Sequence, residues 1–141
     1  MKARIMVGAG LLALILFAPL TLQAQMPQQL FHADIPFPFL AAGTHLPAGH
    51  YHVYHPGDPY QLIIQRDDNR ARAVVYVHTS ETDSKVASTK LVFNKYGDQY
   101  FLSQVWTERD RETHLALKCK AEQILAAKVD KPGVRVVLAK K

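Results

Sequence analysis

Short runs of β-favouring residues, separated by glycine, proline, aspartate and asparagine, dominate the chain from residue 31 onward. The connections between these runs leave no room for the crossover helices that a parallel α/β sheet needs. Evenly spaced short strands are typical of an antiparallel sandwich or barrel. We therefore predict an all-β, mostly antiparallel fold, a small β-sandwich or barrel of about seven or eight short strands. The predicted strands occupy residues 31–39, 50–55, 60–65, 71–78, 88–93, 100–106, 114–118 and 134–138.

Segments outside these runs are predicted to be turns, loops or helix. Pro36 and Pro38 remove backbone donors from the first run, which indicates an edge or terminal strand. The polar residues 79–84 predict a loop, and residues 94–98 predict a hairpin turn around Gly97. Residues 120–128 favour one short C-terminal helix, which the proline and glycine at 132 and 133 would end.

The first 24 residues have the pattern of a secretory signal peptide. Lys2 and Arg4 precede an uncharged apolar run over residues 5–20, and Ala24 is a small residue suited to the cleavage site. The run is shorter than the roughly 20 residues that a membrane-spanning helix needs. We therefore predict a signal peptide over residues 1–24, an exported protein in the periplasm or outside the cell, and no membrane span after cleavage.

The remaining residues 25–141 are predicted to form a single β-rich domain. Without Lys2 and Arg4 the chain keeps 15 basic and 12 acidic residues, a net charge of +3 that gives no reason to expect nucleic-acid binding. Its single cysteine, Cys119, excludes a disulfide scaffold. This thiol would pair between two molecules, stay free, or serve as a small packing residue.

Four segments resemble an uncharacterised group of small exported proteins that is abundant in soil bacteria of the acidobacterial kind. The resemblance extends over about residues 31–127 and implies an exported β-rich domain with no assigned activity. The group has polar residues other than histidine at the places of His50 and His52, and serine at the place of Cys119, where it would cap the following helix with Glu122. The similar segments are residues 33–39, 46–53, 90–102 and 105–106.

Histidine density is the sharpest local feature, because four histidines fall between residues 45 and 55. His50 and His52 are two apart on a predicted strand, so both side chains point to the same face. Two such imidazoles can share a divalent transition metal such as zinc, copper or nickel if a third ligand is present. The alternative is that His50 and His52 form the wet face of an edge-type strand whose Tyr51 and Val53 pack inward.

Signals for catalysis are weak. The nucleophile motif Gly-x-Ser-x-Gly and a phosphate-binding glycine loop are both missing from the sequence, and a Cys119–His114 dyad would lie on opposite strand faces. The leading hypothesis is therefore an exported, non-enzymatic domain that binds a protein or an envelope component. The alternative is a periplasmic metal-binding protein using His50 and His52, and a cupin-like barrel enzyme is a more distant third.

Overall fold

A computed structural model describes residues 26–82, 86–108 and 112–140. The predicted signal peptide, residues 1–24, lies outside this part of the chain. Within it the strands are β1 (Gln28–Ile35), β2 (Phe39–Ala41), β3 (Thr44–Leu46), β4 (Gly49–His55), β5 (Gln61–Arg66), β6 (Arg72–Glu81), β7 (Lys90–Tyr96), β8 (Gln99–Trp106), β9 (Glu112–Ala116) and β10 (Gly133–Leu138). One helix, α1 (Lys120–Ala126), precedes β10.

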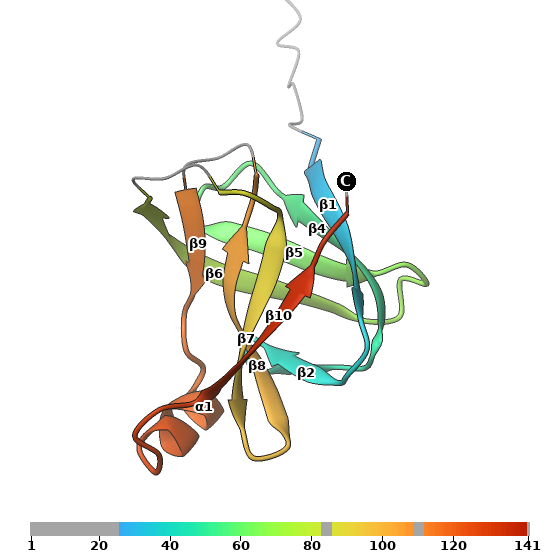
Figure 1. Cartoon of the computed structure of the whole chain (residues 1–141). Helices are drawn as coiled ribbons and strands as arrows, with labels where there is room; N and C mark the ends of the chain where they lie inside the picture. Colours follow the sequence, from blue (N-terminus) through green and yellow to red (C-terminus); the bar gives the residue numbers. More distant parts are fainter. Residues whose placement is uncertain (1–25, 83–85, 109–111, 141) are drawn as a thin grey trace, which may run out of the picture.

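Eight of these strands follow one another in a ring. The order is β1-β4-β5-β6-β9-β8-β7-β10, and every neighbouring pair is antiparallel. An antiparallel bridge between His32 and Lys140 brings the end of the chain back to β1 and closes the ring at one point. Figure 1 shows β10 meeting β1 beside the C-terminus and moving away from it further down. The small hairpin of β2 and β3 joins the ring through a parallel contact with β8.

Strand alternation explains how the ring is filled. On the first run of the sequence, five residues of one parity point inward and are buried: Phe31, Ala33, Ile35, Phe37 and Phe39. The same core takes Tyr51 and Val53 from β4 and Leu62 and Ile64 from β5. One continuous cluster of side chains thus draws on both ends of the described chain, and apolar and aromatic groups fill the interior.

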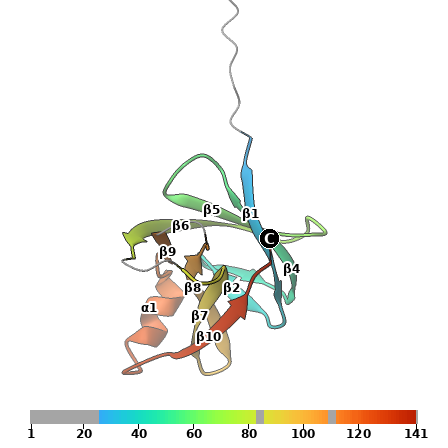
Figure 2. The same cartoon turned by 45° about the horizontal axis from the view of Figure 1, so that its top comes forward.

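A bulge separates a second, smaller apolar cluster, formed by Leu40, Tyr96 and Phe101, from this core. The pairing of β7 with β8 shifts between Val92 and Phe93, so Ser103 of β8 has no partner residue in β7. Because of this bulge, the alternation of β8 side chains between the two sides of the sheet is shifted by one residue at Ser103. Leu102 and Val105 consequently point into the ring, while Phe101 packs outside it with Leu40 and Tyr96. Cys119, Leu125 and Ala126 pack against these three residues. Figure 2 shows α1 lying outside the ring of strands.

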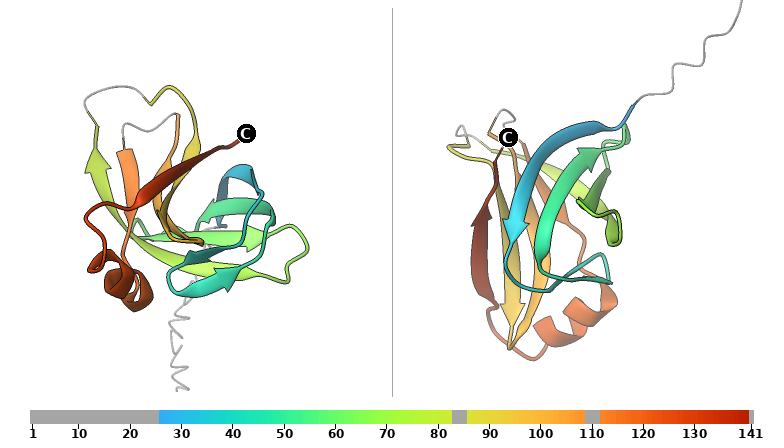
Figure 3. Two further views of the ribbon diagram at one scale, coloured as in Figure 1. Left: turned by 60° about the horizontal axis from the view of Figure 1, so that its bottom comes forward. Right: turned by 90° about the vertical axis from the view of Figure 1, so that its right-hand side faces the viewer.

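The all-β, mostly antiparallel prediction is confirmed, but the strand number of seven or eight is too low. Pro36 and Pro38 split the predicted strand 31–39 into β1 and β2, and β3 was not predicted. Residues 79–81 also belong to β6 and not to a loop, because they pair with β9 after β6 leaves its pairing with β5. Figure 3 shows the long β6 crossing the molecule. The predicted short helix is present as α1.

The described residues contain no helix with the length and apolar character needed to cross a membrane.

Candidate functional site

The two histidines predicted as metal ligands lie together on the outer face of β4. His50 is exposed and His52 is half-buried, whereas Tyr51 and Val53 between and beside them are fully buried. The Tyr51 hydroxyl donates a 2.6 Å hydrogen bond to the carbonyl of Pro47, which fixes the turn that leads into β4. Burial raises the pKa of Tyr51, since the charged phenolate would lose its hydration inside the ring.

His50 pairs with an acidic residue on the neighbouring strand. Asp34 of β1 lies directly opposite His50 in the antiparallel register, and its Oδ1 contacts the Nδ1 of His50. The carbonyl of His50 accepts a hydrogen bond from the Asp67 N–H on its other side. His50 and Asp34 therefore form a pair without mutual backbone hydrogen bonds, the arrangement that brings opposing side chains closest.

His52 has different neighbours. Its Nε2 lies 2.8 Å from Oδ1 of Asp67, in the turn after β5. Across the sheet it faces His32, with 6.2 Å between the ring centroids. Its Nδ1 is buried and has no hydrogen-bond partner in the described part of the chain. Three imidazoles and two carboxylates thus lie on this side of the sheet, contributed by β1, β4 and the turn after β5.

This arrangement does not gather a complete ligand set around His50 and His52. The two imidazoles contact different carboxylates, Asp34 and Asp67, and the other two histidines of the sequence cluster, His45 and His55, lie elsewhere on β3 and β4. Among residues 26–82, 86–108 and 112–140, no three His, Cys, Asp or Glu side chains are placed to hold one metal ion. Metal binding by His50 and His52 stays a prediction.

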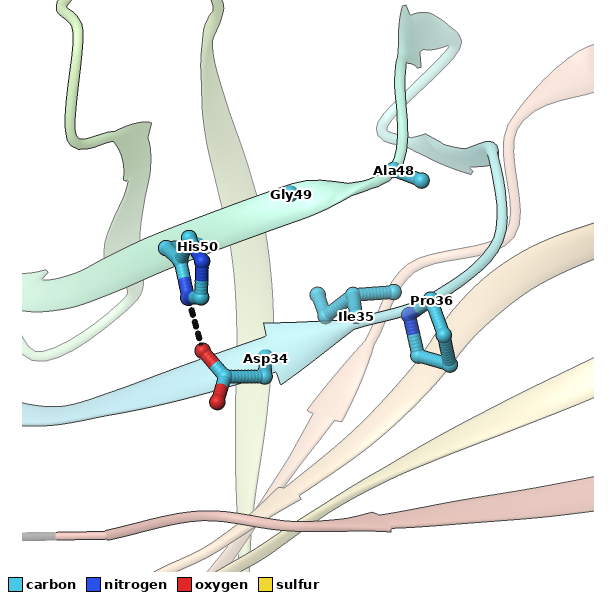
Figure 4. Close-up of a pocket in the computed structure, with 6 residues that line it drawn as sticks. All are labelled: Asp34, Ile35, Pro36, Ala48, Gly49 and His50. Carbon is cyan, nitrogen blue, oxygen red and sulfur yellow. Dashed lines mark hydrogen bonds and ion pairs between the residues drawn. The ribbon is translucent and has the colours of Figure 1, made fainter.

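A pocket of about 380 Å³ opens beside the Asp34–His50 pair. It lies where β1 ends and β4 begins, and Figure 4 shows the bonded carboxylate and imidazole at its side. Its lining comprises Asp34, Ile35, Pro36, Ala48, Gly49 and His50. Four of these six residues are apolar or glycine, and none carries a hydroxyl or thiol. The pocket therefore offers apolar surface and one hydrogen-bonded acid–imidazole pair, which can bind and orient a ligand.

Sequence reasoning found His50 and His52 but missed Asp34, Asp67 and His32. Asp34 lies in a predicted strand and Asp67 in a predicted turn, so each had an adequate local explanation. Strand pairing brings them to the histidines, and the sequence carries no local signal for that pairing. Comparison with known proteins finds no matching family model, no matching curated protein and no matching solved structure.

Proposed function

We propose that this chain is an exported, non-enzymatic binding domain whose pocket beside Asp34 and His50 takes an apolar group of a partner protein or envelope component. One observation carries the proposal. The polar side chains of the pocket are an aspartate and a histidine already bonded to each other, next to apolar Ile35, Pro36 and Ala48. Such a lining provides burial for an apolar group and two polar atoms for orientation.

The filled interior supports binding at the surface over catalysis within the ring. Small barrels that act on a ligand inside them keep a central cavity, whereas here aromatic and aliphatic side chains occupy the centre. Tyr51, Phe31, Phe39 and Phe93 are among the largest of these buried side chains. A cupin-like reaction inside the ring finds no support in this packing.

Site-specific photo-cross-linking tests the proposal in cells that express the full chain. A photo-reactive phenylalanine analogue replaces Ala48, which lines the pocket, and in a matched control it replaces Asp98, which is exposed in the β7–β8 turn. We expect a discrete cross-linked product in the exported fraction from position 48 and none from position 98. A chain that keeps residues 1–24 and stays in the cytoplasm, or the absence of any product specific to position 48, would contradict the proposal.

Metal binding is a second candidate function, favoured by the face that joins β1 and β4. The buried, unpartnered Nδ1 of His52 lies beside the ring of His32, and His50 is one residue pair further along the same face. A divalent transition metal would have to replace one of the two histidine–carboxylate contacts. Metal analysis of the protein and its histidine variants, described below, distinguishes this candidate from the first.

A further inference from the structure

The ring of strands closes at one point and is open below it. The N–H of His32 donates to the Lys140 carbonyl and the N–H of Lys140 donates to the His32 carbonyl, both at 2.9 Å. In the described residues β1 and β10 share no other bridge. Pro36 and Pro38, which follow β1, cannot close the opening, because neither has a backbone N–H to continue a ladder along β10.

β10 therefore presents a free edge. The Ala139 N–H donates to the Thr89 carbonyl beside β7, so odd-numbered residues of this strand bond toward β7 and even-numbered ones face away. The backbone groups of Val134, Val136 and Leu138 point to the open edge, and within the described chain they have no hydrogen-bond partner. Their side chains are 65%, 49% and 69% exposed, respectively. A free strand edge of this kind is a template for another strand.

Arg135 lies on the other face of this edge, and Lys95 lies on the adjoining strand β7, opposite Gly133. The Arg135 guanidinium stacks 4.6 Å from the ring centroid of Phe37, and the Lys95 ammonium lies 5.4 Å from that of Tyr100. Arg135 also donates a 3.4 Å hydrogen bond to the Tyr100 hydroxyl, and this bond lowers the pKa of Tyr100. Neither Arg135 nor Lys95 forms an ion pair with any residue that the structure describes. The edge thus combines an aliphatic outer face with one cation, Arg135, on the inner face, where Val137 is buried in the core.

We propose that the open edge of β10 accepts an extended antiparallel segment of a partner protein, which places apolar residues at alternate positions and an acidic residue opposite Arg135. Side chains that face each other across paired strands lie on the same face of the sheet. Residues opposite Val134, Val136 and Leu138 would therefore be apolar, and a residue opposite Arg135 would be acidic. A second copy of β10 fits less well, because the strand has no acidic residue to place opposite Arg135. This surface goes beyond the pocket described above, and the β10 residues that form it do not line that pocket.

Fluorescence anisotropy with a labelled seven-residue peptide of alternating valine and glutamate tests the proposal on the purified full chain. The Val136→Pro variant removes an N–H that points to the open edge and leaves the bonds to β7 in place. Val136→Thr keeps that N–H and is the matched control. Two further peptides test the same contact without altering the protein. N-methylation of the valines removes the groups that would bond to β10, and N-methylation of the glutamates removes those that face away.

We expect saturable binding that Val136→Pro and valine N-methylation each weaken at least about tenfold, as the loss of backbone bonding requires. Val136→Thr and glutamate N-methylation should leave the affinity within about threefold, and Arg135→Glu should reverse the preference toward a valine–lysine peptide. No binding at roughly 1 mM peptide, or binding that valine N-methylation does not weaken, overturns the proposal. A concentration-dependent dimer that Val136→Pro abolishes would instead assign the edge to a second copy. The cross-linking at position 48 is unaffected by any of these outcomes.

Discussion

Tyr96, at the end of β7, donates a 3.3 Å hydrogen bond to the carboxylate of Glu122 in α1, 26 residues further along the chain. The side chain of Asn94 donates to the same oxygen at 3.0 Å. Glu122 is 3% exposed, so this carboxylate lies between the helix and the sheet. A helix of seven residues is too short to be stable alone, and these bonds together with the contacts of Leu125 and Ala126 hold it in place.

Removing the carboxylate should loosen the helix. Glu122→Ala leaves the donors of Asn94 and Tyr96 without their acceptor, and we expect a loss of about 2–3 kcal/mol in the free energy of unfolding. Glu122→Gln keeps a carbonyl oxygen and should lose only about 1 kcal/mol. Urea unfolding followed by circular dichroism measures both. Equal stability of the alanine variant and the original protein would show that the helix is held by its apolar contacts alone.

Alkaline pH should weaken the same contact. Burial raises the pKa of Tyr96 above the ordinary value of 10.0, and the adjacent Glu122 carboxylate raises it further. The unfolded chain therefore loses this proton before the folded chain does. The stability that this raised pKa provides is complete below about pH 10 and is lost as the pH rises through the folded-state value.

The Tyr96→Phe variant measures this dependence. At pH 8 the variant should be about 1 kcal/mol less stable than the original protein, because one hydrogen bond is missing. We expect the difference to shrink between pH 8 and pH 11 in urea titrations. Lysine deprotonation affects both proteins alike and does not change the difference between their free energies of unfolding. A difference that stays constant or grows toward pH 11 would contradict this prediction.

Cys119 occupies the N-cap position of α1 without capping it. Its backbone is extended, with φ −71° and ψ 165°, and its side chain makes no cap hydrogen bond. Serine has the hydroxyl that an N-cap requires, so we expect Cys119→Ser to raise the free energy of unfolding by about 1 kcal/mol relative to Cys119→Ala. Thermal unfolding of the two variants provides the comparison, and a serine variant no more stable than alanine would exclude this cap. The Oε1 atom of Glu122, the residue that a capping box would use, accepts hydrogen bonds from Asn94 and Tyr96 of β7.

Metal analysis addresses His50 and His52 directly. Untagged protein is purified and its zinc, copper and nickel contents are measured, beside those of a His50→Ala/His52→Ala variant. If the metal candidate is correct, we expect one bound ion per chain that the double variant loses and that His32→Ala weakens. His45→Ala is the matched control, since His45 lies on β3, where it is paired with Leu40 of β2. Metal-free protein with no thermal shift on adding these ions would eliminate the candidate.

The fold was largely predictable because its signals are local. Alternation along residues 50–55 placed Tyr51 inside and His50 outside, and the glycine at 97, with φ 60°, ends β7 in a tight turn as expected. The extra length of β6 was not predictable from polarity, because its last residues are exposed and polar and are held by β9. The change of facing at Ser103 was equally hidden, because a bulge depends on the partner strand.

The sequence by itself determined the strand period, the turns and the presence of His50 and His52 on one face, since each depends on residues a few positions apart. Only the tertiary structure decided that Asp34 faces His50, that Glu122 meets Tyr96, and that His32 of β1 bridges to Lys140 after β10. The physical reason is that strand pairing and packing join distant segments, and a register shift of one residue would move a strand side chain such as Asp34 to the opposite face.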